Sequence, residues 1–246
     1  MLEASAPPAD GIELPFEPFE PLQAERLAQL EAAALEANAT YVEEILEAHA
    51  FCPFSREGRR SGATACEILY PIERSIEPLL AAMLRAAEGG YQVSQLALPG
   101  VEVEPERWSR FCQELTAAGN ARIGARPTFA VAPLHPALPY RRDSGLTIVP
   151  LLRRAPDPTI QWVRLDALAS IYEGRRADAE YVEPERIQQY LQSKKAEAPR
   201  ARKPLYDRIA EANHETTSRL GFEAIEASLE AIHQRARARY REILAG

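Results

Sequence analysis

A cysteine followed by a proline is the part of this sequence whose chemistry is easiest to anticipate. Cys52 lies in the run Phe51-Cys52-Pro53-Phe54-Ser55-Arg56, at the end of a long helical pattern. Because proline is accepted at the first position of a helix, Cys52 can occupy an N-cap, where unpaired N–H groups favour the thiolate. Three arginines follow closely, Arg56, Arg59 and Arg60. The segment predicts a reactive thiol; the alternative is a small apolar residue buried between two phenylalanines.

His135 is the predicted partner of Cys52. It follows the apolar run 128–134, which is typical of a buried central strand. In open α/β sheets ligands collect beyond the carboxyl ends of strands, and His135 is expected there. Guanidinium groups suit phosphate and carboxylate, and the arginines chosen as contacts are Arg56, Arg126 and Arg142. We therefore expect a pocket in which Cys52 is the nucleophile or redox thiol, His135 is the base or orienting group, and the arginines hold a small anionic ligand.

The same two residues support a second hypothesis, a metal- or haem-binding module. A Cys-Pro dipeptide can present a thiolate to haem iron with a histidine opposite, so Cys52 and His135 are candidate ligands. The sequence has no Cys-x-x-Cys or His-x-x-x-His pair, so no metal ligand is assigned and the cofactor stays open. It also has no glycine-rich phosphate loop, no Gly-x-Ser-x-Gly and no His-Glu-x-x-His, the motifs of several common enzyme classes.

The other two cysteines are interpreted mainly as structural. Cys112 falls on the apolar face of a predicted helix and is expected in the core. Cys66 lies in a predicted strand. If its side of the sheet faces Cys52, the two thiols form a possible redox couple; the simpler interpretation is an ordinary sheet residue.

Hydrophobic periodicity predicts the elements that must position these residues. A helix runs from residue 22 to a point before Pro53, and Thr40 with Glu43 reads as a capping box that breaks it near Asn38. Strands are predicted at 64–70, 92–98, 128–134, 146–152 and 159–165, and helices at 76–87 and 104–118. The last two strands should form an antiparallel hairpin. We expect an α/β fold, a mixed sheet of about four to five strands with flanking helices and a long C-terminal helical extension.

The composition divides the chain into four segments. Residues 1–21 are expected to be a disordered, proline-rich acidic tail, in which Phe16 and Phe19 either fold back onto the domain or dock on a partner. Residues 22–174 form the α/β domain, 175–204 a helix and basic linker, and 205–246 a C-terminal helical segment that breaks near Gly221.

The C-terminal segment carries a continuous apolar stripe. Its members step by three and four residues: Phe222, Ile225, Leu229, Ile232, Ala236, Tyr240 and Ile243. Such a stripe must be buried, either on its own domain or on a second copy, which predicts a possible homodimer through 222–244. A third hypothesis follows, a non-catalytic oligomeric interaction protein.

The net charge and the hydropathy of the chain argue against several functional classes of protein. The formal net charge is -7, and the basic segment 194–208 is too narrow to predict nucleic-acid binding. No apolar run reaches the roughly 18 residues of a membrane span, so no membrane association is expected. No secretory signal is recognised at the N-terminus, and three cysteines do not suggest a disulfide framework. A cytoplasmic location is therefore expected.

The sequence resembles an uncharacterised bacterial family (domain of unknown function 1415). The resemblance is carried by the motif at 51–56, by Leu134-His135-Pro136 followed by Tyr140, by the run 146–153, and by Asn213 with Leu220-Gly221. It extends over most of residues 40–222, and residues 1–21, 175–204 and 223–246 look like additions. The resemblance implies a compact α/β domain and brings no established activity.

Overall fold

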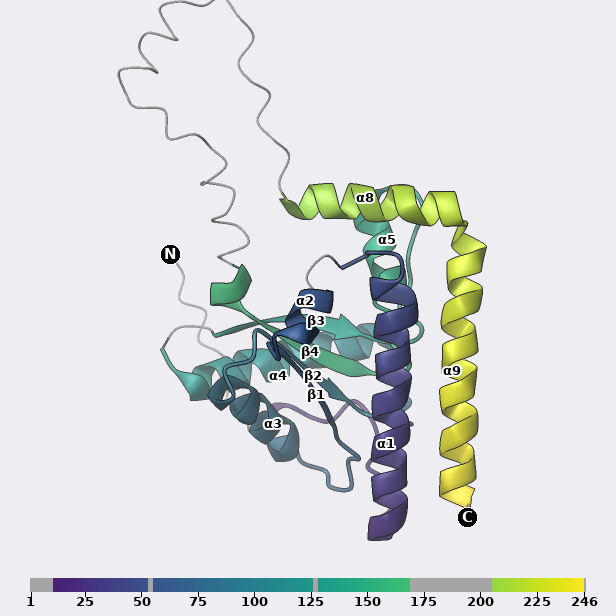
Figure 1. Ribbon diagram of the computed structural model, residues 1–246. Helices are drawn as coiled ribbons and strands as arrows, with labels where there is room; N and C mark the ends of the chain where they lie inside the picture. The colour runs from purple at the N-terminus through teal and green to yellow at the C-terminus, as the bar shows by residue number, and fades with distance from the viewer. Residues whose placement is uncertain (1–10, 53–54, 126–127, 169–204, 246) are drawn as a thin grey trace, which may run out of the picture.

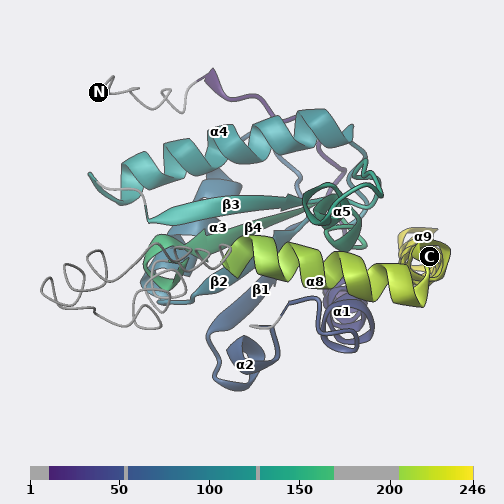
Figure 2. The ribbon, with the colours of Figure 1, turned by 90° about the horizontal axis from the view of Figure 1, so that it is seen from above.

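The computed structural model describes residues 11–52, 55–125, 128–168 and 205–245 (Figure 1). A four-stranded sheet forms its centre, with helices on both faces. Of the two C-terminal helices, the last lies along the first helix, and the other packs on a short helix that precedes the last strand (Figure 2). The predicted α/β class with a mixed sheet is confirmed. None of the helices in these ranges combines the length and apolar character that a membrane span requires.

The sheet has three strands in one direction and one in the other. Its strands are β1 (Thr64–Ile68), β2 (Val93–Ala97), β3 (Phe129–Leu134) and β4 (Thr159–Arg164), in the spatial order β1-β2-β4-β3. β1 and β2 are parallel, and β4 runs antiparallel to both β2 and β3. The carboxyl ends of β1, β2 and β3 therefore lie at the same edge of the sheet, where β4 begins.

One face of the sheet packs on two amphipathic helices. These are α3 (Glu77–Glu88) and α4 (Pro105–Ile123), and both have proline in the first turn, where no N–H is needed. Their inner sides join the sheet residues Leu96, Phe129, Ile160 and Trp162 in the largest apolar cluster. Cys112 of α4 is fully buried there, so its predicted place in the core is confirmed.

The opposite face is covered by the first helix. α1 (Ala24–Tyr41) continues without a break into a π-helical turn, η2 (Val42–Glu47), and a short helix α2 (Ser55–Arg60) follows. The predicted break near Asn38 and the capping box are wrong, because the Thr40 hydroxyl donates to the carbonyl of Glu36 within the same helix. Ala50, just before Cys52, has a φ of 54°, a conformation that residues other than glycine rarely adopt.

The C-terminal segment is two helices, α8 (Leu205–Leu220) and α9 (Phe222–Ala245), joined at Gly221 with a φ of 93°. The predicted break is confirmed. α9 lies alongside α1 (Figure 1), and its stripe, from Ile225 to Ile243, is buried against α1, η2 and neighbouring residues of the same chain. The predicted homodimer through 222–244 is therefore not supported, because this apolar face is already covered.

The segment predicted as a strand at 146–152 is instead a helix, α5 (Gly145–Leu152). Ser144 starts it with a true capping box, in which its hydroxyl accepts from the Thr147 N–H and Thr147 accepts from the Ser144 N–H. Gly145 lets α5 approach α8 closely, since a Cβ there would meet the backbone of Ala210 at 2.5 Å. The β-branched side chains of this segment favoured the strand prediction, but the capping box at Ser144 stabilises a helix instead.

Residues 11–21 of the predicted disordered tail pack on the domain. Phe16 is buried with its ring edge-on to Phe111 at 6.3 Å, and Phe19 stacks on Tyr70 at 4.6 Å. The fold-back alternative is thus confirmed for these two phenylalanines. Residues 1–10 and the predicted helix and linker at 175–204 lie outside the described residues.

Candidate functional site

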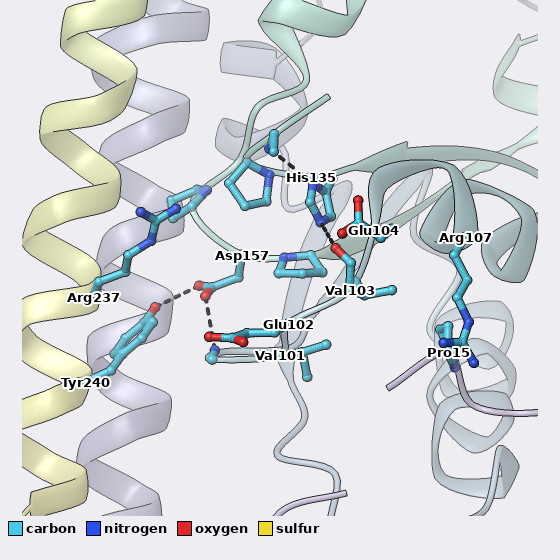
Figure 3. A pocket seen from close by; sticks show the side chains of 15 residues that line it. Pro15, Val101, Glu102, Val103, Glu104, Arg107, His135, Asp157, Arg237 and Tyr240 are labelled. Atoms are coloured by element: carbon cyan, nitrogen blue, oxygen red, sulfur yellow. Dashed lines mark hydrogen bonds between the residues drawn. The ribbon is translucent and has the colours of Figure 1, made fainter. Parts of the chain in front are cut away.

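A cavity of about 650 Å³ opens at the edge of the sheet where β2 and β3 end and β4 begins (Figure 3). We call it the edge cavity. It is lined by residues 100–104 after β2, residues 135–137 after β3, and residues 156–158 before β4, with Arg107 from α4 and Arg237 and Tyr240 from α9. This is the edge at which ligands bind in open α/β sheets, and His135 lies there as predicted.

Asp157 is the buried carboxyl group of the edge cavity. Only 6% of the residue is exposed. Tyr240 donates to its Oδ2 at 2.7 Å and the N–H of Gly100 donates to Oδ1 at 3.4 Å. Burial raises the pKa of Asp157 to about 6, although these two hydrogen bonds and Arg237 act in the opposite direction. Asp157 is therefore a carboxyl group that can exchange a proton near neutral pH.

His135 is held in one tautomer by the loops around it. Its Nε2 atom lies 2.9 Å from the carbonyl oxygen of Val103, which can only accept, so Nε2 carries the proton. Its Nδ1 atom accepts from the N–H of Ala137 at 3.1 Å. Burial lowers the pKa of His135. The imidazole is thus neutral with both nitrogens engaged, and it shapes the cavity wall rather than standing ready as a base.

Two arginines line the edge cavity from helices on opposite sides of it (Figure 3). Figure 3 shows Arg237 on the α9 side and Arg107 on the α4 side, with Asp157 and His135 between them. Within the described ranges no hydrogen bond or ion pair involves either guanidinium group. Most arginines elsewhere in these ranges are engaged; those with ion pairs include Arg59, Arg85, Arg122, Arg142, Arg154 and Arg164. The two cavity arginines are therefore available to an anion.

The first turn of α4 reaches the same cavity. Glu104 is the N-cap residue of this 19-residue helix and makes no side-chain cap hydrogen bond. The first N–H groups of a helix have no intrahelical partner and carry partial positive charge. The carboxylates of Glu102 and Glu104 also lie at the rim. The cavity thus offers both cationic and anionic groups to a ligand.

Cys52 lies in a different cavity from His135. Its cavity, of about 570 Å³, is between the α1–η2 helix and the sheet, and it also holds Cys66 and three amide side chains, Asn38, Gln95 and Gln161. We call it the amide cavity. α2 is described from Ser55 onward, and residues 53 and 54 lie outside the described residues, so the predicted N-cap position of Cys52 stays a prediction. Cys52 and His135 therefore line different cavities, and the predicted shared pocket is not supported by this arrangement.

The predicted anion contacts are also separated. Arg56 donates to the carbonyl of Glu47 at 3.2 Å, away from the edge cavity. Arg142 pairs with Glu223 and Glu226 at the start of α9 and lies 5.0 Å from the ring centre of Phe222. Arg126 lies outside the described residues. Arg142 thus joins α9 to the domain, and the arginines that reach a cavity with His135 are Arg107 and Arg237.

Cys66 shares the amide cavity with Cys52, as the redox-couple alternative requires. Burial raises the pKa of the Cys66 thiol to about 12. It accepts a hydrogen bond from the Asn38 amide at 3.3 Å. A thiol with such a pKa stays protonated at neutral pH, which makes it a poor attacking group.

The metal and haem hypothesis loses its geometric basis. Its two proposed ligands, Cys52 and His135, line separate cavities. In the part of the chain that the structure describes, no group of three or more His, Cys, Asp or Glu side chains is arranged to hold a metal ion.

Several residues of the two cavities were not predicted from the sequence. Asp157 was not among the predicted site residues, and Tyr240 was predicted only as a member of the apolar stripe. The signal for Asp157 was an acidic residue held between two prolines directly before a strand. Gln95 and Gln161 were visible as polar residues inside apolar strand patterns.

Comparison with known proteins identifies no relative. No family model matches the chain, and neither does any curated protein or solved structure. The resemblance to the uncharacterised bacterial family therefore stays a prediction, and the geometry of this chain is what indicates its function.

Proposed function

We propose that the protein binds a small anionic molecule in the edge cavity, between Arg107 and Arg237. The observation that carries the proposal is the pair of arginines that face one cavity without ion-pair partners among the described residues. The volume of about 650 Å³ suits a small molecule.

The acidic rim narrows the ligand class. The carboxylates of Glu102 and Glu104 would repel a ligand that carries several negative charges and has no neutral or cationic polar group to place beside them. They favour a ligand that carries hydroxyl or amino groups beside one phosphate or carboxylate. Asp157, with a pKa near 6, is placed to exchange a proton with such a ligand. We therefore propose binding as the primary role and proton transfer as the chemistry that the cavity supports.

Thiol chemistry is not part of this proposal. Cys52 lines the amide cavity and does not line the edge cavity. A reaction at Cys52 would need a base or an anion contact from the amide cavity, where Arg59 is already paired with Glu43 and Glu47.

The test is a titration with small anions of graded chemistry. Inorganic phosphate, lactate, citrate and aspartate would be titrated into the full chain by calorimetry. Variants R107A and R237A should each weaken the best binder by about tenfold or more, since a charge-assisted hydrogen bond contributes roughly 1.5–3 kcal/mol. The matched control is R110A, which removes an exposed arginine of the same helix that does not line the cavity. Equal affinity in all three variants would contradict the proposal.

A further inference from the structure

The sheet face beneath α1 carries a row of polar side chains where apolar ones are usual. Cys66, Gln95 and Gln161 are register partners on β1, β2 and β4, so they stand side by side across the sheet. All three line the amide cavity. A polar row in such a place must find hydrogen-bond partners.

The side chain of Asn38, on α1, contacts this row from the helix side of the cavity. It is 7% exposed, and its amide nitrogen donates to Gln95 at 2.9 Å as well as to the Cys66 thiol. Gln95 in turn donates to the side-chain oxygen of Gln161 at 2.9 Å. The three amides thus form a directed chain, with Asn38 at one end and Gln161 at the other.

Both ends of the amide chain are incomplete. The Oδ1 atom of Asn38 is buried and has no hydrogen-bond partner. At the other end, the amide nitrogen of Gln161 donates to no group in the described ranges. A buried acceptor without a donor is costly. The amide cavity therefore presents one unused donor, at Gln161, while the unpartnered acceptor of Asn38 is buried beside it.

The rest of the amide cavity is largely apolar and lacks an available charge. Its apolar side chains include Leu35, Val42, Leu46 and Val93. Its arginine, Arg59, pairs with Glu43 and Glu47 at 2.7 and 2.8 Å. A charged ligand would therefore be buried without an available counter-charge, which is unfavourable.

We propose that the amide cavity binds an uncharged, mainly apolar small molecule that carries a carboxamide or lactam group. The ligand carbonyl accepts from the amide nitrogen of Gln161, whose side chain is positioned by Gln95 and Asn38 through the amide chain. The volume of about 570 Å³ is in the range of small-molecule sites. Water is the competing occupant, since it can also accept from the amide nitrogen of Gln161. This site is separate from the edge cavity and does not depend on the anion there.

The test uses benzamide as the probe, with toluene and benzoate as comparisons. Toluene lacks the amide and benzoate carries a charge, so only benzamide should saturably shift the NMR signals of the residues that line the amide cavity. N38A and Q161L should each weaken benzamide binding by about tenfold. The control T40A removes a hydroxyl that bonds only within α1 and should bind as the wild type does. R237A should also leave benzamide binding unchanged, which separates this site from the edge cavity.

Cys52 provides a second readout because it lines the same cavity. Bound benzamide should slow the alkylation of Cys52 by iodoacetamide. If benzamide does not saturate, water alone occupies the cavity and the proposal is overturned. It is also overturned if Q161L binds as tightly as the wild type, or if binding leaves Cys52 alkylation unchanged. Should N38A fail to fold, Q161L decides, because Gln161 is half-buried on β4.

Discussion

Tyr240 donates a hydrogen bond of 2.7 Å to Asp157, across 83 positions of sequence. Tyr240 belongs to α9, and Asp157 to the loop before β4. The bond therefore joins the C-terminal helix to the edge of the sheet where the candidate ligand site lies. Arg237, one turn earlier on α9, faces the same cavity. α9 thus contributes to the site and to the core at once.

The first prediction concerns this bond. Y240F removes the donor from a buried carboxylate, so we expect it to reduce the free energy of unfolding by about 1.5–3 kcal/mol at pH 8. The loss should be smaller at pH 5, where Asp157, with a pKa near 6, is mostly protonated. Urea denaturation at both pH values measures the effect. Y91F is the control, because the Tyr91 hydroxyl makes no hydrogen bond within the described ranges; equal losses in Y91F and Y240F would contradict the assignment.

The second prediction concerns the pH dependence of stability. The pKa of Asp157 is about 6 in the folded protein and 3.8 for the ordinary group, so ionisation favours unfolding. The contribution of Asp157 to stability is fully present below about pH 4 and is lost as the pH rises through 6. D157N removes this loss, so its stability relative to wild type should increase by about 2–3 kcal/mol between pH 4 and pH 7.5.

Chemical denaturation at intervals of half a pH unit measures that difference. His135, whose pKa is lowered by burial, contributes stability that is lost as the pH falls below about 6.5. His135 makes this contribution in both wild type and D157N, so it cancels in the difference between their free energies of unfolding. E102Q, at the exposed rim of the same cavity, is the control. A pH-independent difference between D157N and wild type would show that Asp157 titrates like an exposed carboxyl.

The sequence predicted the location of His135 because that location depends on local pattern. An apolar run of strand length ends at Leu134, and the edge position of the next residue follows directly. The segment 146–152 shows the limit of this reasoning. Its apolar, β-branched composition favoured a strand, while the helix is set by the cap at Ser144 and by packing on α8.

The candidate sites were harder to predict because they join distant segments. The pair of Asp157 and Tyr240 exists only after α9 has packed along α1. The link between Asn38 and Gln95 likewise depends on the register of β2 under α1. No periodicity specifies such pairings. The sequence therefore predicted correctly that His135 follows the carboxyl end of a strand, and paired it with Cys52, which tertiary packing places in another cavity.

The third prediction concerns Cys66. With its pKa raised to about 12 by burial, the thiolate fraction at pH 8 should be on the order of 10³-fold below that of an ordinary thiol. In a C52S/C112S variant, iodoacetamide should therefore react at pH 8 about a thousandfold more slowly than with a cysteine peptide. Mass spectrometry follows the reaction, and unfolding in urea should restore the ordinary rate. A peptide-like rate in the folded variant would contradict both the burial and the raised pKa.

The fourth prediction tests where the α9 stripe is buried. Leu229 is 2% exposed and packs in the cluster that also holds Tyr41 and Ile148 of the same chain. L229A should reduce the free energy of unfolding by about 2–5 kcal/mol, while L244A, at a position that is 40% exposed, should change it by less than about 0.5 kcal/mol. Because the partners of Leu229 are intramolecular, the urea midpoint should not depend on protein concentration. A midpoint that rises with concentration in wild type and not in L229A would instead place the stripe in a dimer interface.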